Sequence, residues 1–196
     1  MTKGRLEAFT DGVMAIIITI MVLELKVPYG GDFEDLKPLF PIFVSYVLSF
    51  IYLAIYWNNH HHMMQTVKHV TGKILWANMH LLFWLSLVPF VTGWMGENHF
   101  TSAAVFLYGT VLLGAAIAYY ILQSLIVISH GKDSILSKAL GKDIKGKISP
   151  ILYIIGMVSA FFNVWVSGFL FVLVAVIWLI PDTRIERTLK SEESKL

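Results

Sequence analysis

The chain has 196 residues, of which 57% are apolar and only 14% are charged. A soluble domain of this length needs more charge to cover its surface, so the composition indicates a membrane protein. The formal net charge of +2 is too small to indicate a nucleic-acid partner, and the absence of cysteine excludes a disulfide framework and thiolate metal sites.

Six apolar segments are predicted to form helices that cross the bilayer. The first covers about residues 4–27 and ends at the breaker cluster Pro28-Tyr29-Gly30-Gly31. It carries Glu7 and Asp11 and lacks a small-x-small cleavage site, so we expect a permanent helix rather than a signal peptide. The second is predicted from about residue 41 to the run of histidines at residues 60–62. The others are predicted at residues 73–94, 101–129, 148–163 and 166–180. A turn around Asn163 would make the last two a helical hairpin, closed by Pro181-Asp182.

The distribution of positive charge predicts the orientation, because Lys and Arg are enriched on the cytoplasmic side of membrane proteins. With six spans, thirteen of the fifteen basic residues fall on one side: Lys3, Arg5, Lys68, Lys73, Lys132, Lys138, Lys142, Lys145, Lys147, Arg184, Arg187, Lys190 and Lys195. The other side has only Lys26 and Lys37. Both termini are therefore predicted to be cytoplasmic, in a single membrane domain over residues 1–196. Residues 131–147 are expected to be a solvated basic loop and about 182–196 a cytoplasmic tail.

Asp11 is the most informative residue of the first helix. If the helix began there, the segment from Gly12 to Leu25 would span only about 21 Å, too short to cross the bilayer. The helix therefore begins earlier, and Asp11 lies about two turns inside it, where a carboxylate needs protein or water partners. Arg5, Thr10 and polar groups of neighbouring helices are the candidates. A structural ion pair and direct contact with a transported ion are both open at this point.

One face of the same helix combines a small residue, a hydroxyl group and bulky aliphatic side chains. Gly12, Ile16, Thr19 and Leu23 lie within about 60° of one another, with Ile20 beside them. This stripe is either a helix-packing face, with Gly12 allowing close approach, or a pore wall. In the second case, symmetry-related Ile16 side chains would form a hydrophobic constriction.

The run His60, His61, His62, followed by Met63 and Met64, invites a metal-site hypothesis. Three consecutive helical residues point about 100° apart, so they cannot all bind one ion without unwinding. No His-Glu-x-x-His pattern accompanies them. Copper handling through His and Met, or a membrane enzyme built on these histidines, is an alternative to a channel or transporter.

Several motifs together resemble one known family. The opening segment Arg5-Leu-Glu-Ala-Phe9-Thr10-Asp11-Gly12 resembles the Arg-x-x-x-Phe-Ser-Asp signature of the lysosomal potassium channel family, transmembrane protein 175, in its prokaryotic branch. Thr10 replaces the usual serine and keeps the hydroxyl. Further segments resemble the family in order and spacing: Trp57-Asn-Asn-His60-His61, Leu75-Trp76-Ala77-Asn78, Leu87-Val88-Pro89-Phe90, and Ile180-Pro181-Asp182 before Arg184-Ile185-Glu186.

The resemblance implies an all-α channel with six transmembrane helices per subunit, no enzymatic activity and no cofactor. It implies a homotetramer in the plasma membrane of a prokaryote, in which four first helices surround a central pore. Ile16 then forms the constriction, Thr19 a polar layer linked to cation selectivity and Leu23 a further apolar ring, with Ile20 sharing the wall. His60 or His61, with Trp57 and Asn78, is implied to hydrogen-bond the Arg5-Thr10-Asp11 network. Phe9 and Gly12 complete the signature.

The function expected on these grounds is passive conduction of potassium ions. The sequence has no Thr-Val-Gly-Tyr-Gly segment, so a carbonyl filter loop of that kind is not available. The resemblance implies a hydrophobic constriction in its place. The alternative is a proton-coupled or ion-coupled secondary transporter that uses Asp11. Saturable exchange with a counter-ion, rather than passive conductance, would favour that alternative.

Overall fold

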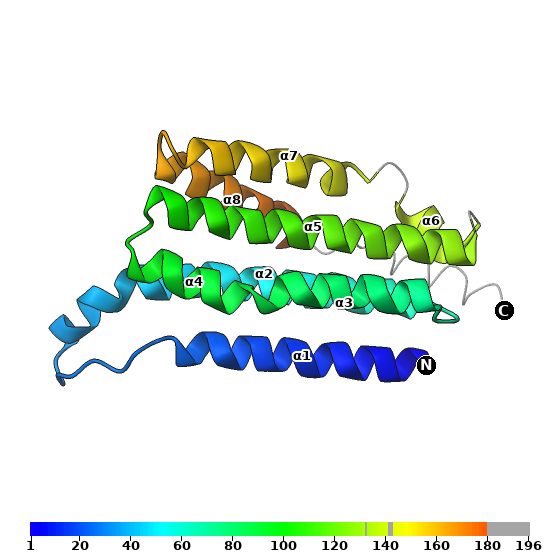
Figure 1. The fold of residues 1–196 in the computed structure, drawn as a ribbon, viewed down its shortest axis with the longest axis horizontal. Helices are drawn as coiled ribbons and strands as arrows, with labels where there is room; N and C mark the ends of the chain where they lie inside the picture. Colours follow the sequence, from blue (N-terminus) through cyan, green and yellow to red (C-terminus); the bar gives the residue numbers. More distant parts are fainter. Residues whose placement is uncertain (132, 141–142, 180–196) are drawn as a thin grey trace.

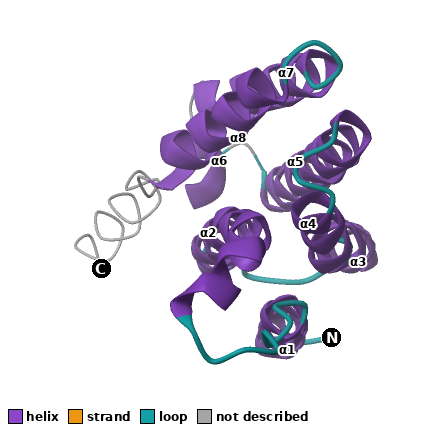
Figure 2. Ribbon diagram, turned by 90° about the vertical axis from the view of Figure 1, so that its left-hand side faces the viewer, coloured by secondary structure: helices purple, strands orange, loops and turns teal. Residues whose placement is uncertain are grey.

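The computed structural model describes residues 1–131, 133–140 and 143–179, and the regular elements of that part of the chain are all helical. The long helices run side by side along the long axis of the molecule (Figure 1). Seen end-on, α1 lies at one edge of the bundle and the pair α7 and α8 at the opposite edge (Figure 2). The main helices are α1 (Lys3–Leu23), α2 (Phe40–Gln65), α3 (Gly72–Ser86), α4 (Val88–Glu97), α5 (Ser102–His130), α7 (Ile144–Ser159) and α8 (Val164–Leu179).

Each of the six predicted segments is helical. Four helical stretches of the described chain are long and apolar enough to cross a membrane: Lys3–Leu23, Phe33–Gln65, Gly72–Glu97 and Ser102–His130. Helices α7 and α8 have 16 residues each, somewhat fewer than the roughly 20 that cross a hydrocarbon core perpendicularly. The turn predicted around Asn163 separates them, and the Asn163 side chain accepts the Trp165 N–H at 2.9 Å.

The segment predicted as one helix over residues 73–94 is broken at Leu87. Pro89, in the first turn of α4, has no N–H to donate to the Leu85 carbonyl, and its ring crowds that carbonyl. The Leu87 N–H closes α3 by bonding to the Trp84 carbonyl instead. The break separates α3 from α4, and both of these helices contact α1.

Two segments outside the predicted spans are also helical. Phe33–Leu39 forms the 3-10 helix η1, whose start is fixed by the Asp32 N–H donating to the Asp35 carboxylate at 3.0 Å. Ile135–Leu140 forms the short helix α6, which buries Leu136 and Ala139. A uniformly solvated loop over residues 131–147 is therefore wrong, because this stretch carries its own apolar face. The predicted tail at 182–196 lies outside the described residues.

Buried polar side chains tie α2 to its neighbours. The Thr92 hydroxyl donates to Ser49 Oγ at 2.6 Å, and Ser49 Oγ lies 3.0 Å from the Tyr108 hydroxyl. The Tyr52 hydroxyl donates to the Phe171 carbonyl at 2.6 Å. Hydrogen bonds of this kind hold membrane helices together where there is no hydrophobic difference between protein and lipid. They join α2 to α4, α5 and α8.

Gly96 allows α4 to approach the backbone of α2. A Cβ atom at Gly96 would lie 2.6 Å from Ile42 Cα, and backbone cannot yield as a flexible side chain does. We expect Gly96→Ala to lower the free energy of unfolding by about 1–3 kcal/mol, the usual cost of overpacking. The control is Gly168→Ala, whose Cβ meets no atom within 4 Å. Unfolding midpoints in detergent compare the two, and equal midpoints would contradict this close packing.

Candidate ion-conduction surface

Helix α1 has one buried face and one exposed face. The buried face packs against α2, α3 and α4 and consists of Leu6, Thr10, Met14, Ile17 and Met21. These residues recur every three or four positions, as one side of an α-helix requires. Much of the rest of the helix circumference is exposed in the part of the chain that the structure describes.

The stripe predicted from the sequence lies on the exposed part of α1. Ile16 is 59% exposed, Ile20 43% and Leu23 74%, and Gly12 and Thr19 are exposed as well. A Cβ atom at Gly12 would meet nothing within 4 Å, so no close helix contact among the described residues uses this glycine. The packing interpretation of the stripe is thus unsupported within one subunit. Contact with another copy and lining of a pore both fit the exposure.

Thr19 adds the polar group of the stripe. Its hydroxyl donates to the Ala15 carbonyl at 2.8 Å, one turn earlier in the same helix. Because the proton is engaged in this bond, the lone pairs of the oxygen stay available. The side chain can therefore present an oxygen acceptor to a cation or to water.

A groove of about 550 Å³ runs beside the stripe, between α1 and the α3–α4 segment. Ile16 and Ile20 border it on α1, and Phe90 borders it on α4, with its ring stacked on Trp94 at a centroid distance of 6.5 Å. Glu24 also lines it. The sequence did not predict this groove, because it depends on the direction that α4 takes after the break at Leu87.

The end of α1 near Leu23 carries acidic groups. Glu24 and Glu97 both line the groove there. Glu97 forms an exposed ion pair with Lys26, whose Nζ lies 2.6 Å from Glu97 Oε1. The hydrogen bond and the charge of Glu97 raise the pKa of Lys26 above its ordinary value. Two carboxylates therefore border the groove at the end of α1 where the apolar stripe stops.

At the other end of α1, a buried hydrogen-bonded chain joins three helices. The Asn78 side-chain amide on α3 donates to Thr10 Oγ1 at 2.9 Å. Asn78 Oδ1 lies 2.8 Å from His60 Nε2 on α2, so this ring nitrogen carries the proton and donates. Thr10, His60 and Asn78 are 2%, 4% and 0% exposed. The chain is therefore shielded from solvent and fixes α1 against α2 and α3.

A second, more exposed contact lies beside the first. The Trp57 indole N–H donates to Asp11 Oδ1 at 2.9 Å. The Trp57 ring stacks on His61 with an interplanar angle of 16°, and His61 Nε2 lies 3.0 Å from the Gln65 side chain. His61 thus supports Trp57 and does not bond α1 itself.

Two residues of the signature stand apart from these contacts. Arg5 is exposed and has no hydrogen bond or ion pair with any described residue. It lies about 120° around the helix from Asp11, which explains why the two do not meet. Phe9 is exposed and lies two turns before Ile16, so it extends the stripe toward the other end of α1.

The histidine run does not converge on a metal. His60 faces Asn78 and His61 faces Trp57, on different sides of α2. Among residues 1–131, 133–140 and 143–179, no group of three or more His, Cys, Asp or Glu side chains could hold a metal ion.

Polar contacts across the middle of the bundle were not predicted. Ser45 and Ser49 on α2 both meet Thr92 on α4, with Ser45 Oγ 3.1 Å from the Thr92 carbonyl. Their spacing of four residues, continued by Tyr52, is the sequence signal that could have indicated a polar stripe on α2.

Comparison with protein families identifies close relatives. Residues 5–89 match the family described as endosomal/lysosomal potassium channel TMEM175. A potassium channel of Chryseobacterium sp. (strain P1-3) is 56% identical over 190 residues, which cover 97% of this chain and 99% of that protein. A potassium channel of Chamaesiphon minutus is 31% identical and covers 87% of this chain and 90% of its own length.

The fold also matches a solved structure. The crystal structure of a lysosomal potassium-selective channel TMEM175 homolog from Chamaesiphon minutus superposes with a TM-score of 0.81 at 28% identity. The match covers 92% of this chain and 97% of that chain.

Proposed function

The chain belongs to the TMEM175 family of potassium channels, and from this premise we propose that α1 lines its conduction pathway. The protein is a potassium channel and not an enzyme, it needs no cofactor, and potassium is the permeant ion. In the proposed arrangement, four copies of the single domain 1–196 surround a central pore. Each copy contributes Ile16 as the constriction, Thr19 as a polar layer and Leu23 as a second apolar ring, with Ile20 sharing the wall.

The observation that carries this proposal is the exposed face of α1. A subunit that buries Leu6, Met14 and Ile17 leaves the Ile16 stripe exposed. Helix α1 itself lies at one edge of the bundle (Figure 2). Closure of four such edges around an axis would cover the stripes and leave a narrow apolar lumen. Hydrophobic constrictions of this kind conduct when they are wide enough to stay hydrated and block when they lose their water.

The orientation follows from charge. At one end of the bundle lie the start of α1 and the connections from α2 to α3 and from α5 to α7 (Figure 1). Lys68, Lys73 and Lys147 belong to that end, and the opposite end has Lys26 and Lys37. By the positive-inside rule, the basic end is proposed to be cytoplasmic, with six spans in a prokaryotic plasma membrane.

The polar residues near the basic end are proposed to anchor α1 rather than to carry the ion. Thr10 and Asn78 are buried in a mutual hydrogen bond, and Asp11 already accepts the Trp57 N–H. His60 completes the anchor from α2, and His61 supports it through Trp57. Asp11 is assigned to this anchor in preference to the coupling site of a secondary transporter.

A single introduced thiol tests the pore, because the native chain contains no cysteine. In proteoliposomes, potassium flux is expected to exceed sodium flux through the native protein. Ile16→Cys is expected to retain flux until a positively charged thiol reagent blocks it, because the reagent then occupies the axis. Ile154→Cys, on the outer helix α7 with a side chain exposed to a similar degree (50%), is the control and is expected to be insensitive. Unblocked flux in labelled Ile16→Cys would exclude the proposed pore.

A further inference from the structure

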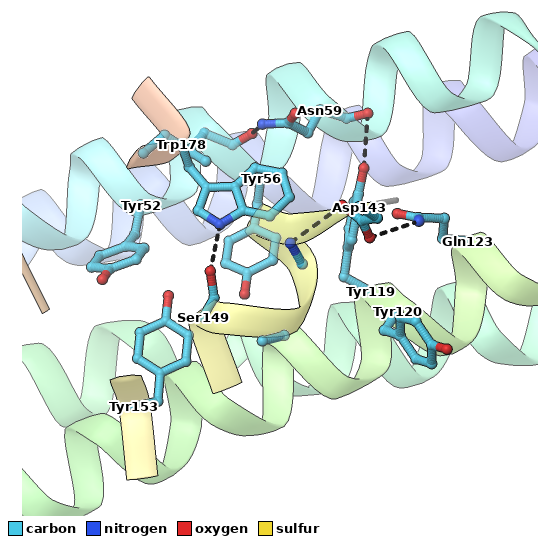
Figure 3. Close-up of a pocket in the computed structure, with 13 residues that line it drawn as sticks. Tyr52, Tyr56, Asn59, Tyr119, Tyr120, Gln123, Asp143, Ser149, Tyr153 and Trp178 are labelled. Atoms are coloured by element: carbon cyan, nitrogen blue, oxygen red, sulfur yellow. Dashed lines mark hydrogen bonds between the residues drawn. The ribbon is translucent and has the colours of Figure 1, made fainter. Parts of the chain in front are cut away.

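A cavity of about 40 Å³ lies inside the part of the bundle farthest from α1 (Figure 3). Its walls come from α2, α5, α7 and α8, and none of the described residues that line it belongs to α1. A water molecule needs about 10–15 Å³ of such space, so the cavity has room for about three waters or one small organic molecule. Its chemistry is unrelated to the conduction surface.

The walls are mainly aromatic. Tyr56 meets Tyr119 edge to face at a centroid distance of 6.1 Å, and Tyr119 meets Trp178 in the same manner at 6.4 Å. Tyr52 and Tyr153 lie at one end of the cavity (Figure 3), and the centroids of their rings are 6.3 Å apart. Aromatic faces carry partial negative charge, and groups of them hold ammonium ions within about 6 Å of the ring centres.

Some of the polar groups around the cavity are acceptors that could receive further hydrogen bonds. Asp143, at the start of α7, receives the Gly146 N–H at 3.2 Å and a long 3.4 Å bond from the Gln123 amide. Asn59 uses its amino group on the Ile55 carbonyl at 2.8 Å, which leaves Asn59 Oδ1 without a donor in the described chain. The Tyr56 hydroxyl likewise has no hydrogen-bond partner among the described residues.

Asp143 takes part in no ion pair within the described residues. The ion pairs of the described chain are Lys26 with Glu97 and Lys37 with Glu34, and neither involves Asp143. A half-buried carboxylate without a cation is costly unless a ligand or water supplies donors. The cavity therefore combines a carboxylate, a free amide oxygen and several aromatic faces around a space of molecular size.

We propose that this cavity binds a small organic ammonium ion, such as an amine with one or two methyl groups. The ammonium N–H groups would donate to the Asp143 carboxylate and Asn59 Oδ1, and the methyl groups would lie against the rings of Tyr56 and Tyr119. A bare potassium ion fits less well, because it replaces its hydration shell with a full set of oxygen ligands and cannot use aromatic walls in that way. The site is independent of the pore proposed above, since α1 takes no part in it.

Methylammonium is the probe, titrated against the full chain in lipid nanodiscs at constant ionic strength, with the thermal midpoint as readout. The native protein is expected to show a saturable rise in midpoint. Asp143→Asn keeps the side-chain oxygen that accepts the Gly146 N–H but removes the charge, and is expected to raise the half-saturating concentration at least about tenfold. Asp133→Asn, an exposed carboxylate outside the cavity, is the matched control and is expected to leave it unchanged.

A second pair of variants distinguishes the contribution of the Tyr56 ring to binding from that of its hydroxyl group. Tyr56→Phe keeps the aromatic face and is expected to bind nearly as well as the native chain, whereas Tyr56→Leu is expected to bind about tenfold more weakly. The proposal is overturned if Asp143→Asn or Tyr56→Leu titrates with methylammonium like the native chain. It is equally overturned if methylammonium gives no saturable shift, in which case the cavity holds water only.

Discussion

Replacing Ile16 with alanine is expected to increase potassium flux through proteoliposomes by about tenfold or more, and to lower the ratio of potassium to sodium flux. Four copies of the shorter side chain would widen the constriction and let it remain hydrated. A barrier lowered by only about 1.4 kcal/mol is sufficient for a tenfold increase in rate. Selectivity is expected to fall at the same time, because a hydrated passage distinguishes the two ions less well. Flux of each ion, measured under identical gradients, gives both quantities.

The matched control is Ile154→Ala, which makes the same change on an exposed position of α7, on the far side of the bundle from α1. It is expected to leave flux and ion ratio unchanged. Ile16→Gln provides the opposite test, since it places a large polar side chain at the proposed axis. Native flux and native ion ratio in Ile16→Gln would show that α1 does not line the pathway.

Asn78→Ala is expected to lower the free energy of unfolding by about 1–3 kcal/mol and to reduce the fraction of assembled channels. Asn78 is fully buried and holds two partners, so its removal leaves Thr10 and His60 without their hydrogen bonds. Interhelical hydrogen bonds in membranes average only about 0.6 kcal/mol, because unfolded helices find other partners. The larger expected cost reflects the loss of two bonds in one shielded chain. Unfolding by a denaturing detergent and native-gel assembly are the measurements.

The control for Asn78 is Asn98→Ala, since the exposed Asn98 side chain bonds, within the described residues, only to the Trp94 carbonyl one turn away. A double-mutant cycle with Thr10→Val isolates the contact between α1 and α3. We expect a coupling energy of about 0.5–1.5 kcal/mol between the two positions. Additive effects of Thr10→Val and Asn78→Ala would mean that this hydrogen bond does not fix α1.

The helices of this protein could be predicted because apolar length alone specifies a span in lipid. The break at Leu87 was missed although Pro89 was visible, since a proline in the first turn of a helix and a proline in its interior look alike until the helix start is known. Helix α6 was missed because six residues with Leu136 and Ala139 on one side form too short a pattern to separate from a loop.

The candidate site was predictable to the extent that it depends on one helix. That Ile16 and Leu23 share a face follows from their angular positions on α1. The exposure of this face is a tertiary property, and the sequence left packing against another helix open. Which neighbours meet Thr10 and Asp11 is a tertiary property, and the bonds to Asn78 and Trp57 were expected only through family resemblance. Arg5 was placed in that network by its motif, yet its angular distance from Asp11 was available from the sequence and argued against it. The aromatic cavity was not predicted because its lining comes from four helices.

The hydrogen bonds that hold α1 lie near its start, and this affects how the helix can move. Every hydrogen bond between α1 and another helix in the described chain comes from Lys3, Thr10 or Asp11. Beyond Asp11 the helix is held by Met14, Ile17 and Met21, whose contacts are non-directional and, for methionine, easily rearranged. Within the described chain, helix α1 is therefore fixed by hydrogen bonds near its start and held by apolar packing alone along the rest of its length. Ile16 lies about 7.5 Å from Asp11 along the helix axis and Leu23 about 18 Å, so a small tilt about Asp11 moves Leu23 more than twice as far as Ile16.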